Sequence, residues 1–293
     1  MAQKSQKSVL ITGCSEGGIG DALAQAFHRK GLHVFATARN LSKIEHLKEL
    51  GLDTICLDVT DAVSIEKAFK TVDSILRNTG GTLDFLVNNS GAGYSMPLLD
   101  TEVSVAQKMF NVNVFALIAV TQAFAPLLIA SKGTIINIGS IAGLSPSYWQ
   151  GYYNASKAAV NLITDQLRVE LEPFGVKVIL VITGVVKTKF FENQPSVKLP
   201  ENSLYAPARD IVEHAAAGNV LLKSAEDVNV YANKVVENAL KKYPQTHQLA
   251  GGNAYAVWFA ATFLWHTIWD WAMPSQWNIG ELKKRLLATK KNE

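Results

Sequence analysis

Short apolar segments alternate along the chain with longer segments whose apolar residues recur at helical spacing. The short segments are rich in β-branched residues and lie at 8–12, 33–39, 54–57, 83–87, 134–138 and 176–182. Helical patterns separate them, at 19–30, 42–50, 63–78, 103–130 and in a segment that ends near 172. Such alternation is typical of parallel strands joined by right-handed helical crossovers. The pattern therefore predicts an α/β fold, a doubly wound parallel sheet with helices on both faces.

Five small or polar residues come directly after predicted strands. They are Gly13, Asp58, Asn88, Ser140 and Gly184. In doubly wound sheets, ligands bind in the crevice outside the carboxyl ends of the strands. We therefore expect five separate segments to meet at one ligand-binding crevice, and this expectation does not depend on any single motif.

The first strand leads into a glycine-rich turn and then into a helix. Four of the eight residues from 13 to 20 are glycine, and the expected dinucleotide contacts are Gly13, Ser15, Gly18, Ile19 and Gly20. Glycines let the backbone approach a pyrophosphate, and a helix N-terminus offers it unpaired N–H groups and positive potential. A plain tight turn is the alternative, but the order of strand, turn and helix favours a Rossmann-type dinucleotide site.

The end of the second strand indicates which dinucleotide binds. A site for NAD places a carboxylate there to bind the ribose hydroxyls, whereas this chain has Ala38 followed by Arg39. A guanidinium can pair with a 2′-phosphate through two hydrogen bonds. Arg39 therefore favours NADPH or NADP+ as the cofactor, and an ordinary surface arginine is the alternative.

Tyr153 and Lys157 stand four residues apart in a predicted helix, downstream of Ser140. Positions i and i+4 share one face of a helix. A free tyrosine has a pKa of about 10, and a nearby cation lowers it. The Lys157 ammonium would thus make the phenol of Tyr153 useful for proton transfer near neutral pH. The same spacing also occurs where an ordinary helix aromatic lies beside a solvated lysine.

Composition places the chain among globular proteins. It has 293 residues, of which 48% are hydrophobic and 18% charged, and a formal net charge of +3 that is too small to indicate nucleic-acid binding. Cys14 and Cys56 show neither metal-ligand spacing nor a disulfide framework, so we expect no metal and an intracellular location. Residues 1–7 are polar and basic and do not fit a signal peptide.

We expect residues 1–250 to form the dinucleotide-binding domain, with 187–223 covering the substrate. Four cations in or near that segment are candidate partners for a substrate phosphate, although solvated surface cations are the simpler interpretation: Lys187, Lys189, Lys198 and Arg209. A helix is predicted to begin with Ser224 as its N-cap and to end before Pro244. Its apolar stripe would be Val228, Tyr231, Val235 and Ala239.

Residues 251–293 form an apolar extension, expected to be helical. Nearly every residue from 254 to 268 is apolar, and five of the six tryptophans lie between 258 and 277. The apolar run is shorter than a spanning helix, tryptophan prefers the headgroup region, and the basic amphipathic tail at 281–291 suits an anionic leaflet. We interpret the extension as a monotopic anchor on a membrane such as the endoplasmic reticulum or a lipid-droplet surface. A buried core or dimer-interface helix and a hydrophobic lid are the alternatives.

Taken together, these motifs resemble the short-chain dehydrogenase/reductase family over roughly residues 8–190. The resemblance implies that Tyr153 is the general acid/base and that Lys157 lowers its pKa while holding the nicotinamide ribose. It implies further that Ser140 hydrogen-bonds the substrate carbonyl and that Asn113 supports a proton-relay water. As hydride adds to a carbonyl carbon, negative charge grows on its oxygen, and positioned hydroxyl donors stabilise that charge.

The resemblance also supplies the remaining cofactor contacts. They are Asp58, Val59, Asn88, Gly91, Val186 and Thr188, beside Tyr153 and Lys157. The chain departs from the family pattern in three places. Its glycine-rich turn is one residue longer, Ser90 replaces an alanine in the Asn-Asn-Ala-Gly loop, and Thr183 replaces a proline. These departures alter the pocket wall and the nicotinamide seat without removing a catalytic group.

Within the family, the chain looks most like the fungal NADPH-dependent 1-acyldihydroxyacetone-phosphate reductases. The supporting features are Ala38-Arg39, residues 110–115, residues 182–188 and the apolar extension. This resemblance implies reduction of a ketone to a secondary alcohol on a lipophilic small molecule such as 1-acyldihydroxyacetone phosphate. The alternative is a tailoring reductase or dehydrogenase of a fungal secondary-metabolite pathway. Family resemblance also implies a homo-oligomer.

Overall fold

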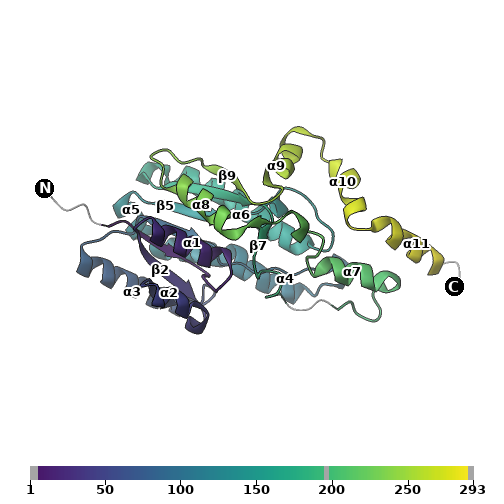
Figure 1. The fold of residues 1–293 in the computed structure, drawn as a ribbon, viewed down its shortest axis with the longest axis horizontal. Coiled ribbons are helices and arrows are strands. Elements are labelled where there is room, and N and C mark those ends of the chain that lie inside the picture. Colours follow the sequence, from purple (N-terminus) through teal and green to yellow (C-terminus); the bar gives the residue numbers. More distant parts are fainter. Residues whose placement is uncertain (1–5, 195–197, 290–293) are drawn as a thin grey trace.

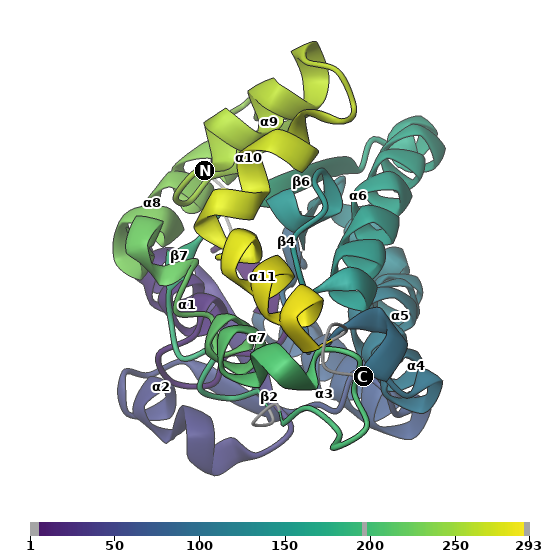
Figure 2. The ribbon, with the colours of Figure 1, turned by 90° about the vertical axis from the view of Figure 1, so that its right-hand side faces the viewer.

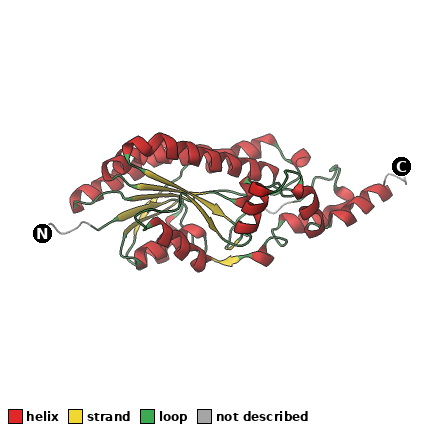
Figure 3. Cartoon of the chain, turned by 90° about the horizontal axis from the view of Figure 1, so that it is seen from above, coloured by secondary structure: helices red, strands yellow, loops and turns green. Residues whose placement is uncertain are grey.

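Seven parallel strands form one twisted sheet between two helical layers (Figure 1, Figure 3). The structure is a computed structural model in which residues 6–194 and 198–289 are described. The strands are β1 (Ser8–Ile11), β2 (His33–Ala38), β3 (Asp53–Cys56), β4 (Phe85–Asn88), β5 (Thr134–Ile138), β6 (Lys177–Thr183) and β9 (His247–Ala250). Their order is β3-β2-β1-β4-β5-β6-β9, and every neighbouring pair is parallel. The predicted Rossmann-type fold is confirmed.

Helices cover both faces of this sheet. They include α1 (Ile19–Arg29), α2 (Glu45–Glu49), α3 (Ala62–Thr79), α5 (Ala116–Ser131) with α4 (Val103–Phe110) before it, α6 (Gly151–Leu171) and α8 (Val228–Ala239). Helix α7 (Arg209–Ala216) instead packs with the C-terminal helices. Alternate strand residues face opposite layers: Val9 and Ile11 pack with α1 and α8, whereas Leu10 packs with α3 and α5. Because both faces are buried, the strands read as continuous apolar runs.

The helical pattern predicted at 103–130 forms one helical stretch, in which a π-helical turn, η3 (Asn111–Phe115), joins α4 to α5. Within the described ranges it is the one helix long and apolar enough to cross a membrane. Its residues Val120, Phe124 and Leu128 are nevertheless buried against the sheet. It is therefore a core helix, and the π turn gives Asn113 a position that regular helical spacing does not predict.

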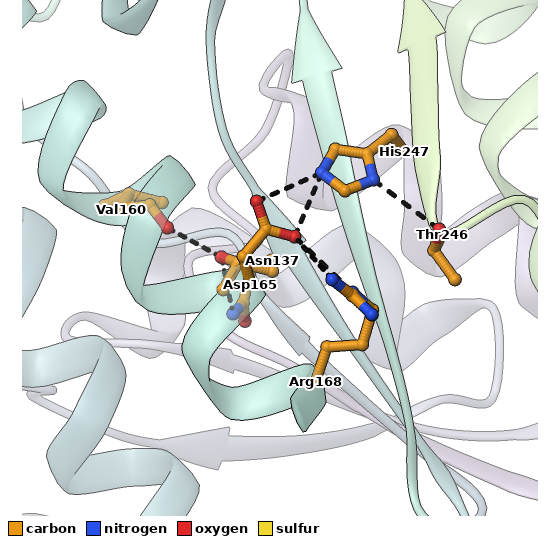
Figure 4. Close-up of polar contacts among 7 residues, drawn as sticks. Asn137, Val160, Asp165, Arg168, Thr246 and His247 are labelled. Carbon is orange, nitrogen blue, oxygen red and sulfur yellow. Dashed lines mark hydrogen bonds and ion pairs between the residues drawn. The ribbon is translucent and has the colours of Figure 1, made fainter. Parts of the chain in front are cut away.

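Strand β9 was not predicted, because its four residues, His-Gln-Leu-Ala, are short and half polar. It pairs with β6 at the edge of the sheet. Figure 4 shows how it is tied to α6: Nε2 of His247 lies 3.0 Å from a carboxylate oxygen of Asp165, which also contacts Arg168. The sheet is thereby extended to residue 250, close to the start of the C-terminal extension.

The prediction that Ser224 caps a helix is wrong. Helix α8 begins at Val228, and the Asp227 carboxylate caps it by accepting from the N–H groups of Asn229 and Val230. Residues 226–227 form strand β8 (Glu226–Asp227), which pairs with β7 (Val186–Lys187) and keeps the chain extended up to the cap. The predicted apolar stripe is present: Tyr231, Val235 and Ala239 are buried, and Val228 packs beside them.

The C-terminal extension is three short helices, α9 (Ala254–Phe263), α10 (Ile268–Gln276) and α11 (Ile279–Thr289). Figure 2 shows α10 and α11 crossing in front of the sheet. A cluster that we call the lobe core joins them to α7; it contains Met96, Trp149, Leu199, Ala208, Ile211, Val212, Ala215, Trp277, Ile279 and Leu282. The apolar face of α11 therefore packs on protein through Ile279 and Leu282, whereas Lys283 and Lys284 are exposed, and its role at an anionic leaflet stays a prediction.

Candidate active site

The glycine-rich turn between β1 and α1 is closed by backbone contacts that admit no side chain at Gly20. A Cβ atom built on Gly20 would lie 2.4 Å from the carbonyl oxygen of Gly13, and Gly13 itself has a positive φ of 73°. Ile19 begins α1 behind the extended residue Gly18. The N-terminus of α1 thus faces this turn with unpaired N–H groups, as an anionic pyrophosphate requires.

The extra residue in the turn is accommodated by Asp21, a residue that sequence reasoning missed. Its buried carboxylate accepts a 2.8 Å hydrogen bond from the N–H of Gly17 and lies 2.9 Å from Nε2 of His46. Gly17 adopts a positive φ of 76°. An acidic residue in the first turn of a helix after a glycine run is the signal that could have identified it.

The loop that follows β4 holds the glycine-rich turn from the other side. The Asn89 side chain donates to the carbonyls of Thr12 and Gly13 at 2.9 and 3.0 Å. The side chain of Asn88 points instead into the sheet layer, where it donates to Thr121 and Asn137. Asn88 therefore shapes the cofactor loop from below, and its side chain does not project into the crevice.

Arg39 and Asp58 meet at the carboxyl ends of β2 and β3. Hydrogen bonds from Thr60 are the main reason that the pKa of Asp58 is lowered, and the charge of Arg39 contributes. Arg39 is exposed, and Val59 is buried beside Asp58. This corner thus has an exposed guanidinium next to an ionised carboxylate and an apolar side chain, as an adenosine carrying a 2′-phosphate would need.

Ser140, Tyr153 and Lys157 come together beyond the end of β5. Ser140 follows that strand and caps the short helix η4 (Ile141–Gly143), its Oγ accepting from the N–H of Ala142 at 3.0 Å. Its hydroxyl also lies near enough to the phenol of Tyr153 to oppose the rise of the phenol pKa, and Tyr153 and Lys157 both lie on α6. The structure therefore brings the three predicted residues into one site.

The predicted lowering of the Tyr153 pKa by Lys157 is not found. Burial of the phenol raises the pKa of Tyr153 to about 12, although part of the ring is accessible, and the Ser140 hydroxyl only partly opposes this. The Lys157 ammonium donates to the carbonyl of Ile138 at 2.9 Å, and burial lowers its pKa to about 8. Desolvation disfavours both charged forms, so Tyr153 stays protonated at neutral pH.

Asn113 acts in this structure as a connector. Its side-chain oxygen accepts from the N–H of Ala92 at 2.7 Å, and its nitrogen donates to the Ala92 carbonyl and to the Ser156 hydroxyl, both at 2.9 Å. A Cβ atom on Gly91 would lie 3.4 Å from the Asn113 oxygen and 3.8 Å from the Lys157 nitrogen. Asn113 thereby fixes the loop at 91–92 beside the catalytic lysine.

Asn161 is a further residue that sequence reasoning missed. It lies one helical turn beyond Lys157 and donates to the carbonyl of Ser140 at 3.2 Å. A Cβ atom on Gly143 would lie 2.6 Å from its side-chain nitrogen, so η4 packs directly on α6. The i, i+4, i+8 spacing of Tyr153, Lys157 and Asn161 is the signal that could have revealed it.

The segment after β6 lies across the site. Phe190 packs on Tyr153, with ring centroids 5.9 Å apart, and the N–H of Lys189 donates to the Gly17 carbonyl at 3.3 Å. Val186 is buried in β7, and the Thr188 hydroxyl accepts from the Phe190 N–H at 3.3 Å. The predicted covering segment therefore touches both the glycine-rich turn and the tyrosine.

The nicotinamide seat has an unexpected support. Thr183, at the position where the family resemblance implies a proline, shares a 2.7 Å hydrogen bond with the phenol of buried Tyr231 on α8. Gly184 then approaches Gly252 so closely that a Cβ atom on it would lie 2.1 Å from the Gly252 carbonyl oxygen. Where a proline would restrict the backbone through its ring, Thr183 thus holds the segment through a hydrogen bond to Tyr231 of α8.

The four candidate phosphate-binding cations lie in different surroundings in the structure. Arg209 donates to the carbonyls of Leu199 and Pro200 and lies 3.2 Å from the Glu213 carboxylate, so it holds the lobe together. The Lys189 side chain covers Gly17, where a Cβ atom would meet it at 3.0 Å. Lys187 and Lys198 are exposed. The four cations are therefore not gathered into one substrate-phosphate site.

A cavity of about 550 Å³ opens along α6, and none of Ser140, Tyr153 and Lys157 lines it. It is bordered by residues 97–99, by most of residues 142–151 between Ser140 and Tyr153, and by Asn154 and Tyr205. Its lining residues, all within the described part of the chain, carry no charged side chain. Trp149 and Tyr205 pack edge to face at its wall, with centroids 4.9 Å apart. The cavity suits an uncharged, apolar molecule.

Comparison with known proteins identifies the family. The model of the short chain dehydrogenase family matches residues 7–198. The chain is 39% identical over 291 residues to the short-chain dehydrogenase virD of Hypocrea virens, covering 99% of each chain. It is 42% identical over 214 residues, 71% of each chain, to the NADPH-dependent 1-acyldihydroxyacetone phosphate reductase of Schizosaccharomyces pombe.

A solved structure extends the likeness to the fold. The short-chain dehydrogenase of Streptomyces avermitilis superposes with a TM-score of 0.74 at 26% identity, over 95% of this chain and 98% of that one. Enzymes of this kind are oxidoreductases that use a nicotinamide cofactor and a small-molecule substrate. The chain belongs to the short-chain dehydrogenase/reductase family.

Proposed function

We propose that the protein is an NADP(H)-dependent reductase that converts a ketone on a lipophilic molecule into a secondary alcohol. The observation that carries the proposal is the pair of neighbouring hydroxyl groups of Ser140 and Tyr153, with Lys157 buried one turn further along α6. Two hydroxyl groups there can donate to one carbonyl oxygen.

The surface that would hold the cofactor supports the choice of cofactor. We call it the cradle; it consists of the glycine-rich turn at 13–20, the loop after β4 and the corner formed by Arg39 and Asp58. The closed approach of Gly20 to Gly13 leaves backbone N–H groups for a pyrophosphate, and Arg39 beside Asp58 supplies a cation for a 2′-phosphate. The relative from Schizosaccharomyces pombe is named as NADPH-dependent. When bound, the nicotinamide would supply the hydride.

Tyr153 is suited to give a proton. Because its pKa is raised to about 12, the phenol carries its proton at neutral pH and can donate it to an alkoxide oxygen as the alcohol forms. Ser140 holds the same oxygen, and the Lys157 ammonium adds a positive charge near the developing negative charge. The protonated tyrosine favours the direction of reduction.

Two substrates are candidates. The name of the Schizosaccharomyces pombe relative points to 1-acyldihydroxyacetone phosphate. The engagement of Arg209 by Leu199, Pro200 and Glu213 supports instead a neutral hydrophobic ketone, as a tailoring enzyme of secondary metabolism would reduce. A phosphate group would have to be bound by the exposed cations Lys187 and Lys198.

The test measures NADPH oxidation with 1-acyldihydroxyacetone phosphate and with a panel of neutral hydrophobic ketones. We expect Tyr153→Phe to lower kcat by about a thousandfold, since general acid catalysis is worth roughly that much. Tyr152→Phe, which alters the adjacent tyrosine, should leave kcat within about twofold. Unchanged turnover in Tyr153→Phe would refute the proposed mechanism, and the preferred substrate decides between the two candidates.

We also propose a homo-oligomer. Phe115, Leu162 and Val169 are exposed large apolar residues on the helical flank formed by η3 and α6. A second copy would remove such side chains from water. Sedimentation of the purified protein tests this, and a monomer at micromolar concentration would contradict it.

A further inference from the structure

Helix α9 is apolar around its whole circumference and yet lies at the surface. None of its ten residues carries a charge, and of these ten described residues only Ala254 is buried. We define the α9 patch as Tyr255, Phe259 and Phe263 with Leu264 and Trp265 of the following turn; their exposed fractions range from 39% to 69%. A surface helix in water normally presents a polar face. This helix presents none.

Five of the seven exposed large apolar residues in the described part of the C-terminal extension lie on α9 and its following turn; the other two are Trp271 of α10 and Leu287 of α11. Trp269 of α10 is 7% exposed, and Trp277 and Leu282 of the lobe core are 2% and 5% exposed. Figure 1 shows α9 projecting beside α10 at the end of the molecule that carries the C-terminus. The adjoining helices are therefore packed on the protein through these residues, and α9 carries most of the exposed large apolar side chains of the extension.

We infer that α9 inserts into one leaflet of a lipid bilayer. Val257, Trp258 and Ala261 are half-buried on the protein side, and the remaining surface of α9 is uncharged and largely apolar, as insertion into an apolar medium requires. Ten residues span about 15 Å, half of the hydrocarbon thickness of about 30 Å, so the helix enters a leaflet without crossing the membrane. Tyr255, near the end of α9 that joins the protein, suits the headgroup level.

The position of α9 links the membrane to the active site. The helix starts two residues after Gly252, which exchanges two 2.8 Å backbone hydrogen bonds with Val185 next to the nicotinamide seat. It also lies beside η4, the segment that follows Ser140. Docking through α9 would therefore place the rim of the crevice at the lipid surface. This placement rests on the proposed reductase function, and it indicates the substrate class: a ketone dissolved in the bilayer.

Flotation of the full-length protein with uncharged phosphatidylcholine vesicles tests the inference. We expect the protein to float, with little dependence on salt, because α9 contains no cation. The double variant Phe259→Glu, Phe263→Glu should bind about a hundredfold or more weakly, because two exposed apolar anchors become charges. Phe174→Glu is the matched control: Phe174 is 51% exposed, against 53% for Phe259, and lies just before β6, at the opposite edge of the sheet from the crevice. It should float like the parent.

Two results would overturn the inference. One is equal flotation of the parent and the double variant. The other is a parent protein that does not float and forms an oligomer that the double variant no longer forms. That result would make the α9 patch a surface for a second copy. Turnover of a water-soluble ketone is measured alongside. Retained flotation without any turnover would refute the reductase function and leave the docking inference standing.

Discussion

The two halves of the crevice are built by different means. On the cofactor side, the glycine-rich turn, the loop after β4 and the end of β6 are held by hydrogen bonds, such as the one that Asn89 donates to Thr12 and the one between Tyr231 and Thr183. On the substrate side, the lobe core joins α7 to α10 and α11 through aromatic and aliphatic packing around Trp277. Hydrogen bonds fix distances within tenths of an ångström, whereas apolar packing is non-directional.

This difference matches what each side has to recognise. A dinucleotide is the same molecule in every turnover, so a rigid cradle is adequate. A lobe held by side-chain volume can change its cavity through substitutions that leave the cradle untouched. The comparison implies that damage to the lobe and damage to the cradle should have separable effects.

The largest expected effect separates the two sides. Trp277 is fully buried in the lobe core, and Trp277→Ala should destabilise the lobe by about 3–5 kcal/mol through the cavity it leaves. The KM for the ketone should rise while the Kd for NADPH stays within about twofold, since the cradle lies on β1 to β4. Trp271→Ala is the control, because Trp271 is 82% exposed.

Hydrogen exchange resolved along the chain tests whether the destabilisation by Trp277→Ala is confined to the lobe. Faster exchange in α7 and α11, with β1 and β2 unchanged, is the expected outcome. Equal acceleration throughout the chain would show that the lobe and the cradle unfold as one unit, and the comparison would then fail.

A smaller effect is expected from the cradle. Arg39→Ala should raise the Kd for NADPH about tenfold to a hundredfold, since a charge-assisted hydrogen bond to phosphate contributes roughly 1.5–3 kcal/mol. The Kd for NADH should change by less than about twofold, because NADH lacks the 2′-phosphate. Arg77→Ala on α3, where the guanidinium pairs with Asp73, controls for loss of surface charge. Equal losses for both cofactors would refute the role of Arg39.

The cradle could be predicted from the sequence better than the lobe. The strands, the glycine-rich turn and the placement of Ser140 near Tyr153 depend on short segments with strong periodicity or fixed spacing. Helix α11 also has a clear apolar stripe, but which surface that stripe meets depends on α7, more than 60 residues earlier in the chain. A stripe at a leaflet and a stripe on a lobe have the same sequence pattern.

Burial is the other quantity that spacing does not provide. The four-residue separation of Tyr153 and Lys157 predicts their common face, yet it does not reveal that Lys157 turns to the Ile138 carbonyl or that the phenol is desolvated. Strand β9 was missed for a related reason, since its pairing with β6 and the contact of His247 with Asp165 join distant segments.

The smallest effect concerns pH and tests where the two sides meet. Because burial lowers the pKa of Lys157 to about 8, its ammonium is present below that pH and is lost above it. The kcat/KM for NADPH, which reports groups of the free enzyme, should be flat below about pH 7 and fall by at most about tenfold per unit above 8. Lys157→Arg keeps its charge in this range, since arginine titrates above about 12, so its lower activity should stay flat to higher pH. A fall at the same pH in both proteins would assign the titration to another group. A fall that began only near 12 would assign it to Tyr153, whose pKa burial raises to about that value.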